Sequence, residues 1–270
     1  DEDIYTGDGT LRAAKDTVVE TLTTGEDGTA QSGLLYLGRY RLEERQAPEG
    51  MVLNTETQTV ELAYARQDVS VTETAASYQN DRQKVEISLN KTMETDNKFG
   101  IGGNGEISDV IFGIYAAKDL TAADGTKIPA DGLIEALPMG KDGTAKFISD
   151  LPLGNYYVKE ISTNKAYVLS NAKYPVEFAY AGQDTADVKL FANDGKTIEN
   201  DLLHGEIHGL KKDEDGNALG GAVMGLFKSD ATAFTKDAVL MTATSADDGS
   251  FSFTDVPYGS YVMREIEAPT

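Results

Sequence analysis

The stretch LGNYYVKE at residues 153–160 has the alternation of a β-strand that carries a charge on its apolar face. In a strand, Tyr156, Val158 and Glu160 point to the same side, because successive side chains alternate between faces. Two bulky residues mark that side as the core, so the third position sends a carboxylate inward. Burying an ionised carboxylate is costly unless it is paired or protonated. The stretch therefore predicts a β fold and requires a reason for Glu160 to face inward.

The chain repeats this motif and others. LGRYRLEE at 37–44 and PYGSYVMRE at 257–265 share the form Gly-x-Tyr-x-apolar-x-Glu, and VELAYARQD at 60–68 returns as VEFAYAGQD at 176–184. Between the motifs lie short alternating segments rich in Val, Ile, Tyr and Phe, with a turn about every ten residues. This pattern is typical of all-β sandwiches, and we expect a helical turn or two only near 116–125.

A further repeat places the module boundaries. YQNDRQKVEISLNK at 78–91 aligns with IENDLLHGEIHGLK at 198–211. Regular spacing of such repeats indicates stacked or tandem modules. We expect the closing part of one module at 1–82, a complete module at 83–203 and the opening part of a third at 204–270. The terminal modules are therefore expected to be incomplete.

Composition excludes several classes of partner and chemistry. The formal net charge is −21, from 45 acidic and 24 basic residues, so nucleic acid and anionic lipid surfaces are poor partners. Apolar runs are too short to cross a bilayer, and we recognise no signal peptide or anchor, so membrane insertion is not expected. The chain has no cysteine, which removes disulfides, thiolate nucleophiles and cysteine metal sites.

Two more polar residues lie on apolar strand faces. Lys91 shares a face with Leu89, and Asn200 shares a face with Ile198. Together with Glu160, the complete module thus sends one Lys, one Glu and one Asn toward its core from three different strands. Equivalent positions in the flanking modules carry part of the same set.

Two interpretations fit this set of residues. The first is a buried Lys–Glu salt bridge capped by the Asn amide, although the desolvation of a buried pair can exceed its Coulombic gain. The second is covalent: burial lowers the pKa of Lys91 and raises that of Glu160. A neutral amine can attack the Asn200 amide, while a protonated Glu160 donates a hydrogen bond to the amide oxygen and then supplies the proton that lets ammonia leave.

The motifs resemble a known family. The Gly-x-Tyr-x-apolar-x-Glu element continues as RQAPEG at 45–50 and as IEAPT at 266–270, and it resembles the E-box of Cna B-type (SpaA-like, prealbumin-like) domains of Gram-positive surface adhesins and pilins. KKDEDGNALGGAVMGLF at 211–227 is similar to the opening strand of these domains. The resemblance implies tandem Greek-key β-sandwiches of the transthyretin or prealbumin type, with an immunoglobulin-like arrangement.

The resemblance also implies roles for individual residues. It implies an isopeptide bond between Lys91 and Asn200 that forms with the help of Glu160. The flanking modules would contribute partial triads at four positions: Glu44, Asn80, Lys211 and Glu265.

As a function, the resemblance implies a structural stalk segment on the extracellular, cell-wall-attached surface of a Gram-positive bacterium. Such a segment needs no cofactor and is not a turnover enzyme. Host matrix protein or glycan would be bound through parts outside this segment. For the terminal modules three alternatives stay open: disorder, truncation, or completion by strands of a neighbouring segment, for which exposed sheet edges are suited.

Several other readings compete. One sandwich face, or the insertion at 94–108, would bind a host glycan or protein directly, and the modules would alternatively be spacers of a secreted hydrolase. GIGGNGE at 100–106 superficially resembles a phosphate loop but lacks the Lys-Ser/Thr of a P-loop. His204 and His208 share a strand face, yet two histidines without a third ligand are a weak zinc signal. The Asp-Gly turns lack the spaced carboxylates of a calcium loop.

Overall fold

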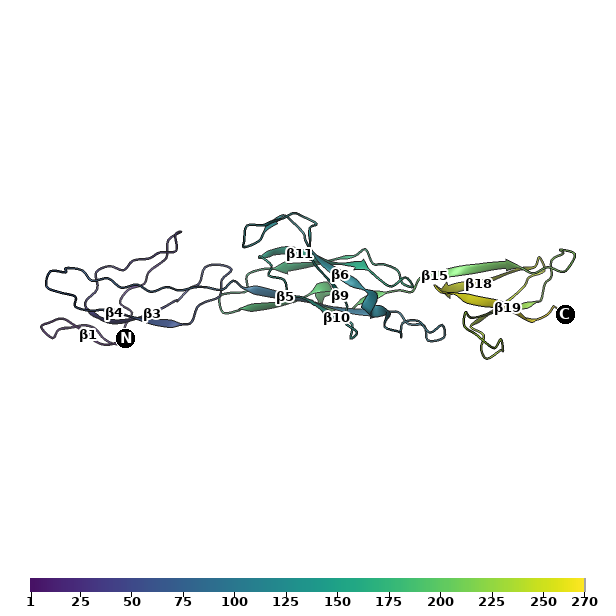
Figure 1. Cartoon of the computed structure of the whole chain (residues 1–270), viewed down its shortest axis with the longest axis horizontal. Coiled ribbons are helices and arrows are strands. Elements are labelled where there is room, and N and C mark those ends of the chain that lie inside the picture. Colours follow the sequence, from purple (N-terminus) through teal and green to yellow (C-terminus); the bar gives the residue numbers. More distant parts are fainter. Residues whose placement is uncertain (270) are drawn as a thin grey trace. The chain divides into compact units, whose positions relative to one another are not determined.

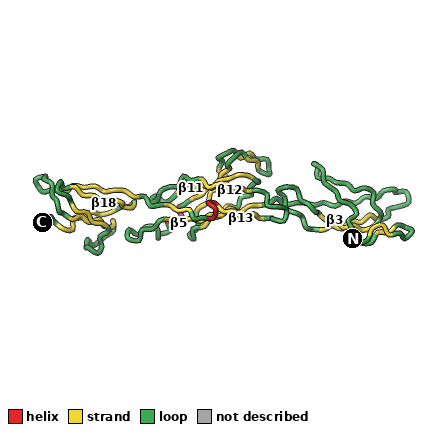
Figure 2. Tube along the Cα trace, turned by 180° about the vertical axis from the view of Figure 1, so that it is seen from behind, coloured by secondary structure: helices red, strands yellow, loops and turns green. Residues whose placement is uncertain are grey.

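The computed structural model describes residues 1–269 and is built almost entirely from strands and loops (Figures 1 and 2). It divides into two compact units: residues 1–83 with 180–187, and residues 84–179 with those from 188 onward. Within the described residues the helices are two 3₁₀ turns, η1 (Glu106–Asp109) and η2 (Ala192–Gly195), and none is long and apolar enough to cross a membrane. The all-β prediction is confirmed.

The first unit contains two antiparallel strand pairs, β1 with β2 and β3 with β4. Tyr40 on β3 is buried, and a Cβ added to Gly38 would collide with the side chain of Ile4. Gly38 also has a φ of 150°, which other residues rarely adopt, so the backbone conformation favours glycine at this motif position. The strands are β1 (Ile4–Tyr5), β2 (Leu11–Ala13), β3 (Gly38–Glu43) and β4 (Thr57–Leu62).

The second unit begins with a sandwich that we call the β5–β14 sandwich. One sheet has the order β10-β5-β13, with β14 pairing parallel to β5, and the other has the order β12-β11-β6-β9. Its strands are β5 (Lys84–Met93), β6 (Ile111–Ala116), β9 (Leu133–Pro138), β10 (Thr144–Phe147), β11 (Gly154–Ser162), β12 (Lys173–Phe178), β13 (Asp187–Phe191) and β14 (Ile198–Asn200).

The core of this sandwich lies between the inner faces of the two sheets. Fully buried aromatic side chains from three strands, Phe112, Phe147 and Tyr156, pack with the aliphatic residues of β5. Burial of side chains this large is the main favourable contribution to folding. The alternation read from 153–160 is thus realised in β11, where Tyr156, Val158 and Glu160 are all buried.

The remainder of the second unit consists of two smaller sheets, β15 with β18 and β17-β16-β19. A core of Leu226, Phe251, Phe253 and Val256 lies between them. The strands are β15 (His204–Leu210), β16 (Val223–Lys228), β17 (Met241–Thr244), β18 (Ser250–Pro257) and β19 (Tyr261–Glu267).

The helical turn expected near 116–125 is wrong. The chain forms a small hairpin there, from β7 (Leu120–Thr121) and β8 (Lys127–Ile128). Between them the Asp124 carboxylate accepts the Thr126 backbone N–H at 2.9 Å, and Gly125 has a φ of 86°. Asp-Gly turn chemistry thus prevails over the helix propensity of the alanines.

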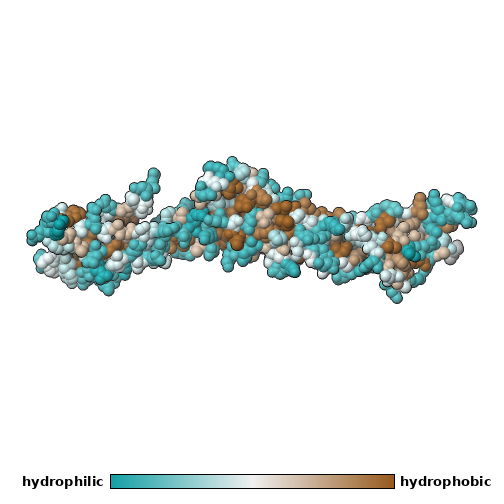
Figure 3. All heavy atoms as spheres, in the orientation of Figure 1, coloured by the Kyte–Doolittle hydropathy of each residue, from teal (hydrophilic) through white to brown (hydrophobic). Residues whose placement is uncertain are grey.

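Hydrophilic side chains cover much of the visible face, as expected from the net charge of −21 (Figure 3). Apolar spheres are visible along each part of the chain in this view. Most of the large apolar side chains of β5, β6 and β11 are nevertheless buried. A net charge this far from zero favours solubility in general.

Candidate functional site: a buried Lys, Glu and Asn

Three polar side chains are buried in the β5–β14 sandwich, and each comes from a different strand. Lys91 follows Leu89 on the inward face of β5, Glu160 follows Val158 on β11, and Asn200 follows Ile198 on β14. Their exposed fractions are 2%, 1% and 2%. The two-residue alternation of each strand is what carries them inward.

Asn200 is held by its amide nitrogen. Nδ2 donates to Glu160 Oε1 at 2.6 Å and to the Thr163 hydroxyl at 2.9 Å. The second Glu160 oxygen accepts the Ser170 backbone N–H at 3.2 Å. Asn200 Oδ1 is buried without a hydrogen-bond partner in the described structure. Leaving a buried carbonyl without a hydrogen bond costs about 1–3 kcal/mol. A buried polar atom without a partner therefore calls for an explanation, and a catalytic role is one.

The orientation of the amide differs from the sequence-based expectation. We expected Glu160 to donate to the Asn200 oxygen, whereas the structure has the Asn200 nitrogen donating to Glu160. The physical reason is that the donors of the amide are on its nitrogen, so its NH₂ end faces the two oxygen acceptors, Glu160 Oε1 and the Thr163 hydroxyl. The acid therefore lies beside the nitrogen that would leave as ammonia.

Lys91 is buried beside the strand that carries Asn200. Its Nζ donates to the Thr92 carbonyl at 2.6 Å and to the Ile198 carbonyl at 3.3 Å. Ile198 is the residue of β14 paired with Lys91, two positions before Asn200. Burial lowers the pKa of Lys91 to about 8, although the negative charge of Glu160 opposes the shift. Roughly a tenth of the amine is then neutral at pH 7.

The flanking repeats bring together the pairs that the sequence predicted for them. In the first unit, Asn80 Nδ2 donates to Glu44 Oε2 at 2.7 Å, and the Asn54 backbone N–H donates to the same oxygen at 2.7 Å. In the second unit, Lys211 Nζ lies 3.1 Å from Glu265 Oε2, with both side chains partly exposed. In both repeats the motif glutamate thus accepts the asparagine amide and the backbone N–H ten residues after it, through one oxygen in Glu44 and through both oxygens in Glu160.

Sequence reasoning missed Thr163. It occupies the position of Ala47 and Ala268 in the other two repeats, three residues after the motif glutamate. Aligning the repeats could have found it, because threonine replaces the alanine of the other two repeats and adds a hydroxyl beside the motif. Its hydrogen bond to Asn200 makes it part of the site.

The other candidates have local explanations. In the 100–106 loop, the Glu106 carboxylate accepts the backbone N–H groups of Gly102 at 3.0 Å and Asn104 at 2.7 Å, where a phosphate would bind. His208 contacts Glu206 at 3.1 Å, and within residues 1–269 no group of three or more metal-binding side chains occurs. Phe99, in the insertion, packs edge-on against Tyr261 with centroids 5.6 Å apart.

Comparison with known proteins identifies the family. The model of the SpaA prealbumin-like fold domain matches residues 3–76, 95–193 and 205–270. The chain belongs to the SpaA family of prealbumin-like fold domains. The expected resemblance and the tandem sandwich fold are therefore confirmed, and the three matches agree with a repeated SpaA architecture.

A larger protein is among the solved structures that this chain resembles. The Bacillus anthracis TIE protein matches with 24% identity and a TM-score of 0.65, over 92% of this chain and 39% of that chain. The chain thus spans well under half of that protein, and the likeness shows the fold alone.

Weaker structural matches include a Streptococcal ancillary pilin (20% identity, TM-score 0.31, 87% of this chain and 68% of that chain). BcpA, the major pilin subunit of Bacillus cereus, matches with 16% identity and a TM-score of 0.33, over 99% of this chain and 83% of that chain. Superpositions this poor carry no structural argument. None of the curated proteins compared with the chain is significantly similar to it.

Proposed function

We propose that the chain is a structural segment of a Gram-positive cell-surface adhesin or pilus-like protein, stabilised by a self-formed isopeptide bond between Lys91 and Asn200. The observation that carries the proposal is the pinned amide of Asn200. Its nitrogen is held by Glu160 and Thr163, while its carbonyl oxygen is buried without a partner. A salt bridge between Lys91 and Glu160 would not need this arrangement.

The chemistry is an intramolecular acyl transfer in which atoms and charges balance. The neutral Lys91 Nζ attacks Asn200 Cγ, so a new N–C bond forms as the carbonyl oxygen becomes negative. Glu160 passes a proton from the attacking nitrogen to Nδ2, the C–Nδ2 bond breaks and ammonia leaves. No electron is gained or lost. Holding amine and amide together in a dry site can lower the barrier by roughly 7–11 kcal/mol.

The environment favours each step. Burial disfavours the charged ammonium, which provides the neutral nucleophile. Glu160 lies 2.6 Å from the departing nitrogen, within the range for direct proton transfer. Each chain reacts once, so the process is self-modification and not turnover.

We further propose that the flanking pairs belong to equivalent bonds. Glu44 with Asn80 lacks a lysine and Lys211 with Glu265 lacks an asparagine, and we propose that the missing residues lie in segments outside 1–270. The module boundaries at 1–82, 83–203 and 204–270 are part of the same proposal. The family supports a location on the outer surface of the cell wall.

Direct host binding through the 94–108 insertion is a weaker candidate. Phe99 of the insertion packs against the core of the β15–β19 sheets and against Tyr261. Its apolar side chain is therefore used within the second unit. This favours a bracing role for the insertion over ligand recognition.

Intact mass spectrometry tests the proposal. The protein should be lighter than its sequence mass by one ammonia molecule, and peptide mapping should recover a branched fragment that joins Lys91 and Asn200. Lys91→Ala should have the full mass of its sequence. A full mass for the unmodified protein would refute the bond.

A further inference from the structure

Two loops of the chain share a sequence and a turn. The A-Y-x-x-Q-D segments 63–68 and 179–184 follow β4 and β12. In the first loop the Val69 N–H donates to the Arg66 carbonyl at 3.2 Å, and in the second the Thr185 N–H donates to the Gly182 carbonyl at 3.3 Å. The two loops therefore share this backbone hydrogen bond, although the accepting residue is Gly182 with a φ of 92° in the second loop and Arg66, outside the positive-φ region, in the first.

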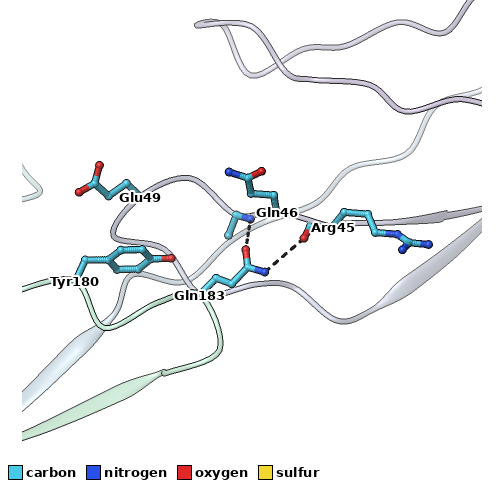
Figure 4. Close-up of a pocket in the computed structure, with 6 residues that line it drawn as sticks. Arg45, Gln46, Glu49, Tyr180 and Gln183 are labelled. Carbon is cyan, nitrogen blue, oxygen red and sulfur yellow. Dashed lines mark hydrogen bonds between the residues drawn. The ribbon is translucent and has the colours of Figure 1, made fainter.

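The second loop is occupied, and its glutamine does most of the binding (Figure 4). Gln183 Oε1 accepts the Ala47 backbone N–H at 3.0 Å, and Gln183 Nε2 donates to the Arg45 carbonyl at 3.4 Å. The Gln183 carbonyl accepts the Leu53 N–H at 2.9 Å. The Gln183 side chain thus bonds to the backbone at Arg45 and Ala47, which are one and three residues after the motif residue Glu44.

Tyr180 and Gln83 complete this contact. The Tyr180 hydroxyl donates to the Met51 carbonyl at 3.3 Å. Gln83, only 2% exposed, donates to the carbonyls of Gly182 at 3.1 Å and Thr185 at 2.7 Å and accepts the Ala181 N–H at 2.9 Å. A loop with a fixed backbone therefore grips the segment 45–53 mainly through main-chain groups, as in other peptide-recognition modes that depend on backbone pairing.

The first loop presents the same groups to solvent. Tyr64 is 66% exposed and Gln67 is exposed, whereas Tyr180 and Gln183 are both half-buried. An exposed tyrosine and glutamine on a preformed turn are well suited to an interface, because a tyrosine supplies contact area at low conformational cost. The occupied loop shows which ligand this turn accepts.

We infer that the loop 63–69 is a docking surface for the segment that follows the motif glutamate in a neighbouring SpaA-type module. The expected ligand is a Glu-x-x-Ala-Pro segment like residues 44–48, in which the alanine N–H bonds to the Gln67 oxygen and the carbonyl one residue after the glutamate accepts from its NH₂. Such a segment recurs as EIEAP at 265–269. The counterpart that begins at Glu160 departs from it, with Thr163 in place of alanine.

This docking surface is independent of the Lys91–Asn200 bond. It would repeat the contact that 180–187 makes with 45–53, now between the loop 63–69 and the equivalent segment of another module. When modules are joined in one polypeptide by a short linker, the effective concentration is about 1 mM, so a contact with a Kd well below that value is largely formed.

NMR titration of the isotope-labelled full chain tests the inference. The probe is the unlabelled peptide ERQAPEGMVLN, which has the sequence of residues 44–54. We expect saturable shifts of the backbone amides of 63–69 and of the Gln67 side-chain amide. Gln67→Ala should weaken binding at least tenfold, whereas Gln31→Ala, at another exposed glutamine, should leave it unchanged.

A second peptide removes the donor that the loop is expected to read. In the peptide, proline at the position of Ala47 has no N–H for the Gln67 oxygen, so this peptide should bind at least tenfold more weakly. The spectrum of each variant reports its own folding. The inference is overturned if no saturable shifts occur in 63–69, or if Gln67→Ala and the proline peptide bind as well as their parents.

Discussion

Replacing Glu160 by glutamine should separate the effect of the cross-link from that of the packing around it. Glutamine has nearly the same shape and still offers an oxygen to Asn200 Nδ2, but it cannot pass a proton from the amine to the leaving nitrogen. The variant should therefore fold with the full mass of its sequence. Intact mass spectrometry measures this directly.

The size of the stability loss follows from the loop that the bond closes. Residues 91 to 200 make a loop of 200 − 91 + 1 = 110 residues. By the chain-entropy relation used for disulfides, closing such a loop stabilises the fold by about 5 kcal/mol. The guanidinium unfolding midpoint of Glu160→Gln should thus fall by roughly 1–2 M.

Glu44→Gln is the matched control. Glu44 accepts the Asn80 amide and a backbone N–H just as Glu160 accepts Asn200 and Ser170, so the chemical change is the same in the other compact unit. Its mass deficit should equal that of the parent protein. If Glu160→Gln retains the mass deficit, or lacks it yet unfolds at the parent's midpoint, the reasoning about Glu160 is wrong.

Three further outcomes are expected. With a photocaged lysine at position 91, the rate of ammonia loss after uncaging should rise about tenfold per pH unit below pH 8 and level off above it. The reason is that the pKa of Lys91 is lowered to about 8 and only the neutral amine attacks. A pH-independent rate between 6 and 8 would contradict this. Thr163→Val should slow the same reaction by roughly tenfold, because losing one hydrogen bond costs about 1.4 kcal/mol. Thr163→Ser, which keeps the hydroxyl, should react at the parent's rate. Equal rates for the parent and both variants would show that Thr163 does not assist the reaction. Gln183→Ala should destabilise the first unit by about 1–2 kcal/mol and speed hydrogen exchange of the Ala47 amide, because two hydrogen bonds are lost. Unchanged exchange at Ala47 would show that the loop contact is weak in solution.

The sequence was sufficient to predict the strands and the inward direction of the three polar side chains. Alternation has a period of two, so the face of Lys91 and of Asn200 follows from their neighbours once the strand is recognised. The internal repeats then placed Glu160 with them. Burial below 3% at all three positions agrees with this expectation.

Other features depended on information that alternation does not contain. The orientation of the Asn200 amide is set by its tertiary contacts with Glu160 and Thr163, and Thr163 reaches the site from a loop after β11 has ended. The contact between Gln183 and Ala47 joins residues 136 positions apart. Local patterns give no account of such pairing, because a loop acquires its partner only when the whole chain is folded.

The parallel pairing of β5 with β14 decides how the sandwich responds to a pull on its two ends. Ile198 lies opposite Lys91 and Asn200 opposite Met93, so the first and last strands of the sandwich run in the same direction. Opposite forces applied at residues 84 and 200 would slide these strands past each other. The backbone hydrogen bonds between β5 and β14 would then bear the force together instead of breaking one after another. Shearing requires many bonds to break together, so even before any covalent tie is made, this geometry resists extension along the chain.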